Sequence, residues 1–297
     1  MMMKFTCNTG ELNQGINSAL LAVSPKSTLL ALEGILVRVT TKEITLMSYN
    51  LEMGITAIVD AKVEKTGEII IPAKVFSDII RRIESDEVTI EADDRCLVQI
   101  TGGVSQFTIL GMTSEEFPEL PEVGEAQGFS IPMETLSSMV DMTRYAIATN
   151  DTKPVQTGCL FELQDDELVV VAVDGFRLAL RREGTQMGVT DTACQFVIPA
   201  SALNEVSKIC GDTDETIEIV QGTRHIMFRI DQTTLITRRL EGEFLNYSQA
   251  IPADNPISVT VDRRQLISSI ERCSLIITEQ QKSPLRCTFG DGVLTLR

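Results

Sequence analysis

The most constraining feature of this sequence is an internal repeat. A shift of 124 residues carries Phe5 onto Phe129 and Gly34 onto Gly158 without a gap. The same shift superimposes GILVRVTTKEITL, which begins at Gly34, on GCLFELQDDELVV, which begins at Gly158. A long ungapped match that preserves both the apolar phase and the glycine position is hard to obtain by chance. The chain is therefore expected to be built from copies of one module.

The repeat extends through the second half of each module and then begins a third time. The segment IIIPAKVFSDIIRRIESDEVTIE around Pro72 matches FVIPASALNEVSKICGDTDETIEI around Pro199, and ISVTVDRRQLISSIERCSLII opens a third copy. This third copy reaches only about 40 residues into a repeat of roughly 124 before Arg297, so we expect a C-terminally truncated third module. The sequence predicts two complete domains and half of a third: residues 1–123, 124–254 and 255–297.

Each module has an internal pattern of strands and helices. In the first module we expect strands at 4–7, 34–39, 43–49, 53–59 and 68–71, with helices at 10–23 and 73–83. The second helix carries apolar residues at helical spacing, which predict one buried stripe: Val75, Phe76, Ile79, Ile80 and Ile83. The predicted fold class is α+β, with repeated βαβββ halves and two helices packed on antiparallel sheets in each domain. Val123–Gly128 and Ile251–Pro256 are typical of linkers.

Composition excludes several other classes of protein. Hydrophobic residues make up 43% of the chain and charged residues 23%, which is ordinary for a globular protein. No run approaches the ~18 uncharged apolar residues that a membrane span needs, and the N-terminal residues do not resemble a secretory signal. Seven cysteines without a CxxC spacing predict reduced thiols in a cytoplasmic protein.

Catalytic chemistry is restricted by the presence of a single histidine, His225. This excludes a histidine triad or a multi-histidine metal site, and we expect no metal and no cofactor. An enzyme that uses Asp174 with Arg177, or the thiol of Cys194, is an alternative. Against it, a DG dipeptide more often forms a turn, and His225 lies in the alternating GTRHIMFRI, where a strand residue is expected.

The net charge of −16 argues at first sight against binding to nucleic acid, whose phosphates attract Lys and Arg. Net charge reports only the average field, however, whereas binding depends on where the basic side chains are grouped. A chain that is acidic overall can still present one basic surface.

Five segments, in order along the whole chain, resemble the bacterial sliding clamps, the β subunits of DNA polymerase III. They are EEFPELP at 115–121, NDTKPVQTG at 150–158, AVDGFRLAL at 172–180, FVIPASALNEVSKI at 196–209 and RRLEGEFLNYSQAIP at 238–252. The resemblance also carries the same three-unit repeat. No single segment would suffice, but together they are specific.

The resemblance implies the DNA-clamp fold and a non-catalytic processivity factor of bacterial DNA replication. Clamps of this family are homodimers whose helices line a hole around duplex DNA, which they bind independently of sequence. They tether the DNA polymerase III α subunit, the clamp loader, and other polymerases and repair proteins through short peptides, and they have no membrane association. An alternative is a truncated clamp fragment that acts only as a peptide-binding interaction module.

The resemblance also implies which residues face DNA. The basic and polar side chains that match the family's DNA-facing helices and loops are Lys26, Lys74, Arg81, Asn150, Lys153 and Lys208. Further basic residues lie on the same or later expected helices: Arg82, Arg144, Arg263, Arg264 and Arg272. Lys74 and Arg81 are seven residues apart and share one helical face. The alternative for any one of them is an ordinary solvated helix charge.

The family's cleft for partner peptides lies between the second and third domains. Its matching positions here are Gln156, Val173, Gly175, Phe176, Arg177, Leu178 and Pro252. Gly175 would permit a tight turn, and Leu178 would offer an apolar surface to a peptide. Gln156 departs from the apolar residue usual in the family, which implies a more polar wall. The alternative is a plain hairpin with Leu178 in the core.

The family's subunit contact joins the first domain of one subunit to the third domain of the other. The matching residues are Ile79, Ile83 and Phe107 on one side, and Leu275 and Ile276 on the other. Ile79 and Ile83 lie at i, i+4 on a helix, so they could equally be core residues.

Overall fold

The computed structural model describes residues 3–124, 127–150, 152–164, 167–184, 194–210, 215–252, 254–277, 284–290 and 292–297. The chain forms two compact units, Met1–Leu245 and Asn246–Arg297. The predicted boundary between residues 123 and 124 falls inside the first unit, and the division into three domains stays a prediction. Below, residues 3–121 are called the first copy of the repeat, and residues 127–245 the second copy.

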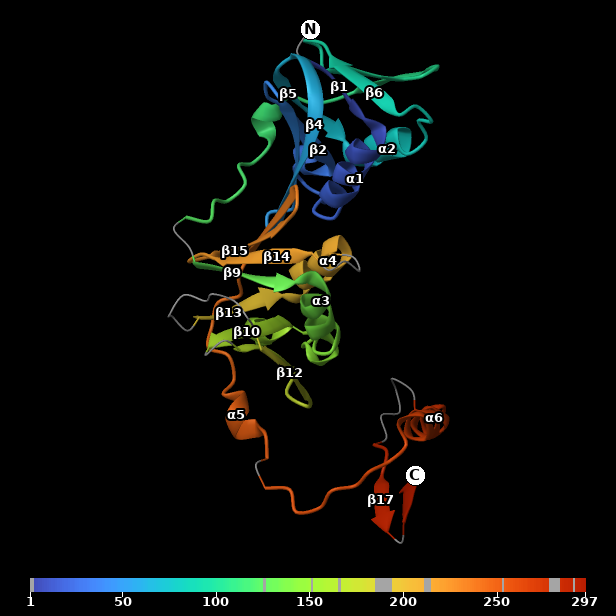
Figure 1. Ribbon diagram of the computed structural model, residues 1–297, viewed down its shortest axis with the longest axis vertical. Helices are drawn as coiled ribbons and strands as arrows, with labels where there is room; N and C mark the ends of the chain where they lie inside the picture. Colours follow the sequence, from blue (N-terminus) through green and yellow to red (C-terminus); the bar gives the residue numbers. More distant parts are fainter. Residues whose placement is uncertain are drawn as a thin grey trace. The chain divides into compact units, whose positions relative to one another are not determined.

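The first copy follows the predicted order of strands and helices (Figure 1). Its elements are β1 (Met3–Asn8), α1 (Thr9–Leu20), the 3-10 helix η1 (Leu30–Glu33), β2 (Gly34–Val39), β3 (Glu43–Tyr49), β4 (Met53–Lys65), β5 (Gly67–Pro72), α2 (Ala73–Ile80), β6 (Glu87–Ala92), β7 (Leu97–Gly102), β8 (Ser105–Leu110) and η2 (Ser114–Glu116). The Asn8 side chain caps α1 by accepting a hydrogen bond from the Glu11 N–H at 3.0 Å. The bounds predicted for β2 and β3 are confirmed.

The second copy repeats this order. It contains β9 (Gln127–Pro132), α3 (Met133–Asp141), η3 (Arg144–Ala146), η4 (Pro154–Thr157), β10 (Gly158–Gln164), β11 (Glu167–Val173), β12 (Leu178–Gly184), β13 (Cys194–Pro199), α4 (Ala200–Cys210), β14 (Thr216–Gln221), β15 (His225–Ile230) and β16 (Thr233–Arg238). Both copies thus read βαβββ–βαβββ in α-helices and strands, which confirms the predicted fold class.

Several predicted details were wrong. Helices α1 and α2 end at Leu20 and Ile80, three residues before their predicted ends. Strand β4 runs six residues beyond the predicted end at Val59, because its second half pairs with β1 while its first half pairs with β3 and β16. The predicted linker Val123–Gly128 is too long, because Gln127 and Gly128 already pair with β14. Val75 is 46% exposed, so it is not part of the buried stripe on α2.

The helices of each copy cover one side of its sheets. Helix α1 lies beside α2, and α3 lies beside α4. In the first copy the apolar sides of α1 and α2 pack on strand residues such as Phe5 and Ile90. In the second copy Leu136 of α3 and Val206 of α4 pack with Phe161. These alternating apolar positions bury two cores of similar construction.

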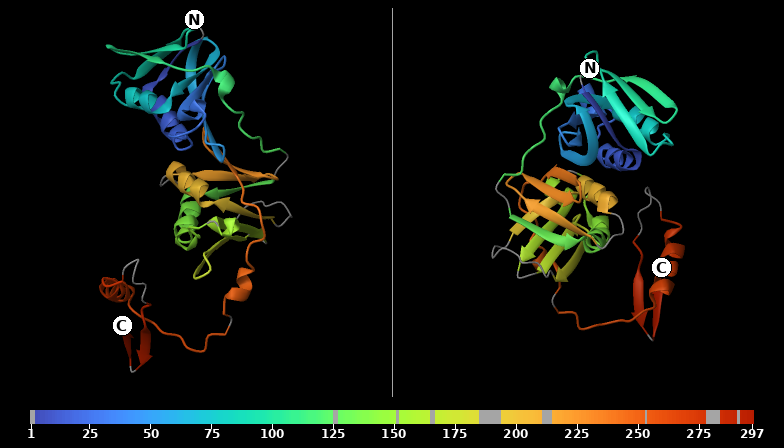
Figure 2. Two further views of the ribbon diagram at one scale, coloured as in Figure 1. Left: turned by 180° about the vertical axis from the view of Figure 1, so that it is seen from behind. Right: turned by 45° about the horizontal axis from the view of Figure 1, so that its top comes forward.

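The two copies share a sheet. Strand β4 of the first copy pairs antiparallel with β16 of the second, in a register that places Ile55 opposite Leu235. The described strands therefore form a continuous series in the order β8-β7-β6-β1-β4-β16-β15-β14-β9. Figures 1 and 2 show α1, α2, α3 and α4 on the same side of the joined sheets. We call the outward side of these helices the helix face, and the opposite side of the strands the sheet face.

The second unit contains α5 (Tyr247–Ala250), α6 (Arg263–Ser274) and the hairpin of β17 (Cys287–Gly290) and β18 (Val293–Leu296). The Asp262 side chain caps α6 by accepting a hydrogen bond from the Gln265 N–H at 2.8 Å. The described residues of the predicted linker Ile251–Pro256 form neither helix nor strand. The helix followed by a strand pair matches the order α1, β2, β3 of the repeated module, whereas the described residues before α6 form no strand equivalent to β1.

Within the described part of the chain, no helix combines the length and apolar character that crossing a bilayer requires.

Candidate functional site

Three of the residues predicted to face DNA lie in equivalent loops of the two copies. Lys26 lies between α1 and η1, whereas Asn150 and Lys153 lie between η3 and η4. The repeat offset carries Lys26 onto Asn150 and η1 onto η4. All three side chains are exposed. Among the described residues, neither Lys26 nor Lys153 has a carboxylate within 4.0 Å, so both ammonium groups are available to an anion.

The other predicted DNA-facing residues lie on the helix face. Lys74 is exposed in the first turn of α2, and within the described part of the chain it too has no ion-pair partner. Arg81 donates to Asp78 Oδ1 at 2.7 Å, and Lys208 Nζ lies 2.8 Å from Glu205 Oε2. Each of these two bases therefore pairs with a carboxylate three residues earlier on the same helix or at its end.

Three of the remaining basic residues considered from the sequence are also engaged within their own helices or turns, whereas Arg263 and Arg264 of α6 are exposed. Arg82 lies 3.3 Å from Asp78, and Arg144 lies 3.1 Å from Asp141. In the second unit Arg272 donates to the hydroxyls of Ser268 and Ser269.

The predicted peptide-cleft residues Gly175, Phe176, Arg177 and Leu178 come together at the β11–β12 turn. Asp174 Oδ1 accepts hydrogen bonds from the N–H groups of Phe176 and Arg177, each at 3.0 Å, and Arg177 Nε donates to Asp174 Oδ2 at 2.8 Å. The hydrogen bond from the Phe176 N–H makes the largest contribution to holding the pKa of Asp174 below its usual range. The N–H and the guanidinium of Arg177 lower this pKa further. Gly175 has φ +87°, a conformation that favours glycine.

The side chains around this turn differ in exposure. Phe176 is 99% exposed, Leu178 is half-buried, and Val173 is only 4% exposed. The Arg177 guanidinium lies 6.0 Å from the ring centre of Tyr145, which is itself exposed. Tyr145 was missed from the sequence because nothing in its local pattern distinguishes an exposed tyrosine from a buried one.

Gln156 and Pro252 are the two further residues predicted for the cleft. Gln156 is half-buried in η4, and its carbonyl accepts a hydrogen bond from the Ala148 N–H at 3.0 Å. Pro252 belongs to the second unit, where its side chain is exposed.

The residues predicted for the subunit contact divide into two groups. Ile79 and Ile83 are each 8% exposed and belong to the first core, which is the alternative that their spacing left open. Phe107 is 39% exposed on β8, which ends the series of paired strands. In the second unit Leu275 and Ile276 follow α6, and each is 82% exposed.

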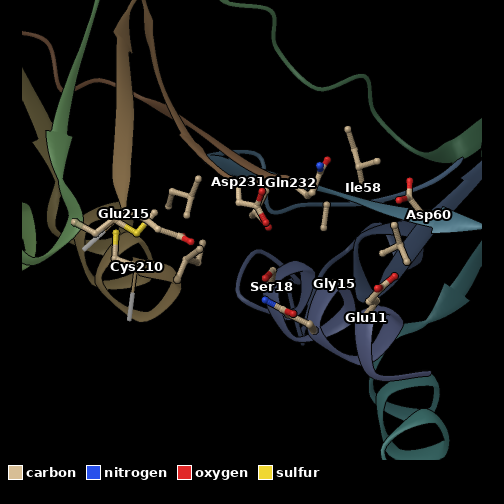
Figure 3. A pocket seen from close by; sticks show the side chains of 16 residues that line it. Glu11, Gly15, Ser18, Ile58, Asp60, Cys210, Glu215, Asp231 and Gln232 are labelled. Atoms are coloured by element: carbon tan, nitrogen blue, oxygen red, sulfur yellow. The ribbon is translucent and has the colours of Figure 1, made fainter. Parts of the chain in front are cut away.

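A cavity of about 500 Å³ opens between the copies, lined by α1, β4, α4 and the β15–β16 turn (Figure 3). The carboxylates that line it are Glu11, Asp60, Glu215 and Asp231. No three His, Cys, Asp or Glu side chains of the described residues are arranged to hold a metal ion, here or elsewhere.

The residues considered for catalysis have ordinary structural roles. Asp174 and Arg177 are accounted for by the turn that they stabilise. Burial, followed by the charge of Arg238, lowers the pKa of His225 on β15, and burial raises the pKa of the Cys194 thiol. The described contacts thus give neither His225 nor Cys194 the partner that would activate it.

Comparison with known proteins agrees with this architecture. The family model for the N-terminal domain of the DNA polymerase III beta subunit matches residues 3–121, and that for its central domain matches residues 130–246. The beta sliding clamp of Staphylococcus epidermidis is 29% identical over 303 aligned residues, which cover 99% of this chain and 80% of the relative.

Solved structures give the same result. The crystal structure of a putative DNA polymerase III beta subunit from Eubacterium rectale superimposes with a TM-score of 0.94 at 32% identity, covering 99% of this chain and 80% of that one. The sliding clamp of Bacillus subtilis gives a TM-score of 0.92 at 26% identity, with 98% and 78% covered. The fold superimposes on a solved beta subunit, and a family model of that subunit matches each copy of the repeat. The chain therefore belongs to the family of bacterial sliding clamps, the beta subunits of DNA polymerase III.

Proposed function

We propose that this chain acts as a processivity factor by placing its helix face against duplex DNA, as part of a ring that encircles the duplex. The observation that carries the proposal is the strand pairing that connects the two copies. Pairing of β4 with β16 continues one sheet into the next and leaves α1, α2, α3 and α4 on a single side. Repeating this geometry around a closed ring would line its hole with helices.

The chemistry of the helix face suits a surface along which DNA must slide. Lys26, Lys74 and Lys153 offer exposed, flexible ammonium groups from helices and loops rather than from a shaped pocket. Such groups contact phosphates and carry no sequence information. Weak, sequence-independent contacts hold the duplex centred while topology, rather than affinity, prevents release.

The β11–β12 turn is proposed as one wall of a cleft for partner peptides. Phe176, Leu178 and Tyr145 provide apolar surface around the Arg177 guanidinium, a combination typical of binding hot spots. We propose the DNA polymerase III α subunit, the clamp loader, and other polymerases and repair proteins as its partners. Tethering a polymerase here would raise its effective concentration at the primer end without new DNA contacts.

Ring closure is proposed to proceed through a homodimer. Strand β8 ends its sheet and leaves backbone groups and Phe107 open to another strand, which is the usual basis of edge-to-edge association. Leu275 and Ile276, both highly exposed, are proposed as the opposing surface. We propose a cytoplasmic location and a tethering role without catalysis, as for a replication subunit that acts on the bacterial chromosome.

The DNA-facing role is tested by neutralising Lys26 and Lys153 together. With both changed to Gln, the slope of log affinity against log salt for a linear duplex should become shallower by about 2, since each lost phosphate contact removes about 0.9. Fluorescence anisotropy over a salt series measures the slope.

The matched control changes Lys62 and Arg229 to Gln. Both bases lie on the sheet face, in strands β4 and β15, and form ion pairs with Glu87 and Glu218. The control loses the same charge but should keep the wild-type slope. Equal slopes for wild type and the Lys26/Lys153 variant would refute the proposed DNA surface.

A further inference from the structure

Most bases on the helix face are paired with a carboxylate one turn earlier in the same segment. Asp78 lies 2.7 Å from Arg81 and 3.3 Å from Arg82 at the end of α2. Asp141 lies 3.1 Å from Arg144 at the end of α3, and Glu205 lies 2.8 Å from Lys208 on α4. Arg81, Arg144 and Lys208 each follow their acid by three residues. The same arrangement thus occurs in both copies of the repeat.

These pairs lie on the side of the helices that faces away from the sheets. The buried residues of α3 are Met133, Leu136, Met139 and Val140, and those of α4 are Ala202, Leu203, Val206 and Cys210. Asp141, Arg144, Glu205 and Lys208 instead line one open groove between α3 and α4, with a volume of about 410 Å³. Both ion pairs are therefore on the surface that the proposed function gives to DNA.

An ion pair of this kind changes how a base meets a phosphate. The carboxylate already holds the guanidinium or ammonium group, so a phosphate must displace it before a close contact forms. Exposed pairs of this geometry are weak, which makes the exchange possible but not free of cost. The bases proposed to contact DNA thus fall into two classes: Lys26, Lys74 and Lys153, without a carboxylate partner among the described residues, and the four bases beside Asp78, Asp141 and Glu205.

We propose that Asp78, Asp141 and Glu205 compete with DNA phosphates for Arg81, Arg82, Arg144 and Lys208, and thereby keep the DNA contact weak enough for sliding. This inference rests on the proposed function, because it requires the helix face to meet DNA. Acid-before-base pairs at this spacing also stabilise a helix by a small amount. The two roles are separated by the salt dependence of DNA binding, which helix stability does not set.

The test is a triple variant, Asp78→Asn, Asp141→Asn and Glu205→Gln, in the full chain. Each change keeps the shape of the side chain and removes its charge. We expect tighter binding to a linear duplex, by roughly two- to fivefold for each base released. The slope of log affinity against log salt should steepen by about 3, because Arg81, Arg144 and Lys208 lose their carboxylate partners, whereas Arg82 still donates to the Asp78 backbone carbonyl at 2.8 Å.

The control is a second triple variant with the same change in net charge: Glu87→Gln, Glu167→Gln and Glu218→Gln. These carboxylates hold Lys62, Arg182 and Arg229 on the sheet face, at 3.1, 3.1 and 2.9 Å. Alternation along the strands places them opposite the helix-covered cores, as the inward positions of Val88, Leu168 and Ile217 show. The affinity of this control variant for a linear duplex should change by less than about twofold, and its slope of log affinity against log salt should stay that of the wild type.

The outcomes distinguish this inference from the proposed function. If the helix-face variant binds like the sheet-face variant, while neutralising Lys26 and Lys153 still makes the slope shallower, the competition is refuted and the DNA surface stands. If none of these variants alters the slope, the proposed DNA surface fails, and the competition fails with it. Thermal unfolding followed by circular dichroism checks that each variant is folded. Asp141→Asn alone is a milder variant, and its slope of log affinity against log salt should steepen by about 1.

Discussion

Gly34 and Gly158 occupy the same position in the two copies, and both are required for the same reason. Each begins a strand, β2 or β10, that lies directly against β5 or β13. A Cβ atom at Gly158 would overlap the Ile198 carbonyl oxygen and lie 2.9 Å from Leu240 Cδ1; one at Gly34 would overlap Ile70 Cγ2. Neither glycine has a positive φ, so the requirement is for space and not for an unusual backbone conformation.

This residue-scale argument predicts the effect of filling that space. Gly158→Ala should lower the free energy of unfolding by about 1–3 kcal/mol, because the neighbouring backbone cannot move without disturbing the β10–β13 pairing. Urea unfolding followed by circular dichroism measures the change. The control is Gly184→Ala on β12, where no described residue other than its chain neighbour has an atom within 4 Å of the added Cβ, and it should stay within about 0.5 kcal/mol of wild type. Equal stability of the two variants would contradict the close approach.

At the scale of elements, the two copies use one turn in two ways. Asn50 Oδ1 accepts hydrogen bonds from the N–H groups of Glu52 and Met53 between β3 and β4, as Asp174 does between β11 and β12. In the first copy Met53 is buried because it pairs with β16, whereas Leu51 and Glu52 are exposed and the Glu52 carbonyl accepts a hydrogen bond from the Arg238 N–H. In the second copy the equivalent residues are Phe176 and Arg177, and both are exposed. The turn itself is therefore structural, while its exposure supports a binding role.

The apolar wall of this turn should matter for partner peptides. Leu178→Ala should weaken binding of a peptide from a DNA polymerase III α subunit by about 1–3 kcal/mol, because the half-buried leucine offers apolar surface beside Phe176. Isothermal titration calorimetry measures the affinity, and a wild-type circular dichroism spectrum checks the fold. Leu97→Ala removes an exposed leucine from β7 in the first copy and should leave affinity unchanged. Unaltered peptide binding by the Leu178 variant would place the cleft elsewhere.

Local pattern predicted the elements best where local forces decide them. The bounds of β2 and β3 follow from a short apolar run and an alternating run, each between turn residues, and the hairpin around Asp174 follows from its DG dipeptide. The length of β4 could not be predicted, because its second half is held by β1 and its first half by the distant β16. The exposure of Tyr145 likewise depends on geometry that residue spacing alone does not give.

At the scale of the whole molecule, an acidic protein can still present a DNA-binding surface. The net charge is −16, yet Lys26, Lys74 and Lys153 extend into solvent without carboxylate partners among the described residues. Acidic side chains also line the cavity between the copies and lie beside the basic residues of the helix face. Such a mixed surface gives weak contact with phosphates, which is what sliding requires.

The central claim, that the helix face and not the sheet face meets DNA, is tested most directly by site-specific photocrosslinking. A photoreactive amino acid is placed at Lys74 or Lys153 and, as controls on the sheet face, at Lys62 or Arg229; each variant is then irradiated with duplex DNA. The account predicts crosslinks from Lys74 and Lys153, and none above background from Lys62 and Arg229. Crosslinking from the sheet-face positions that equals or exceeds that from the helix-face positions would contradict it.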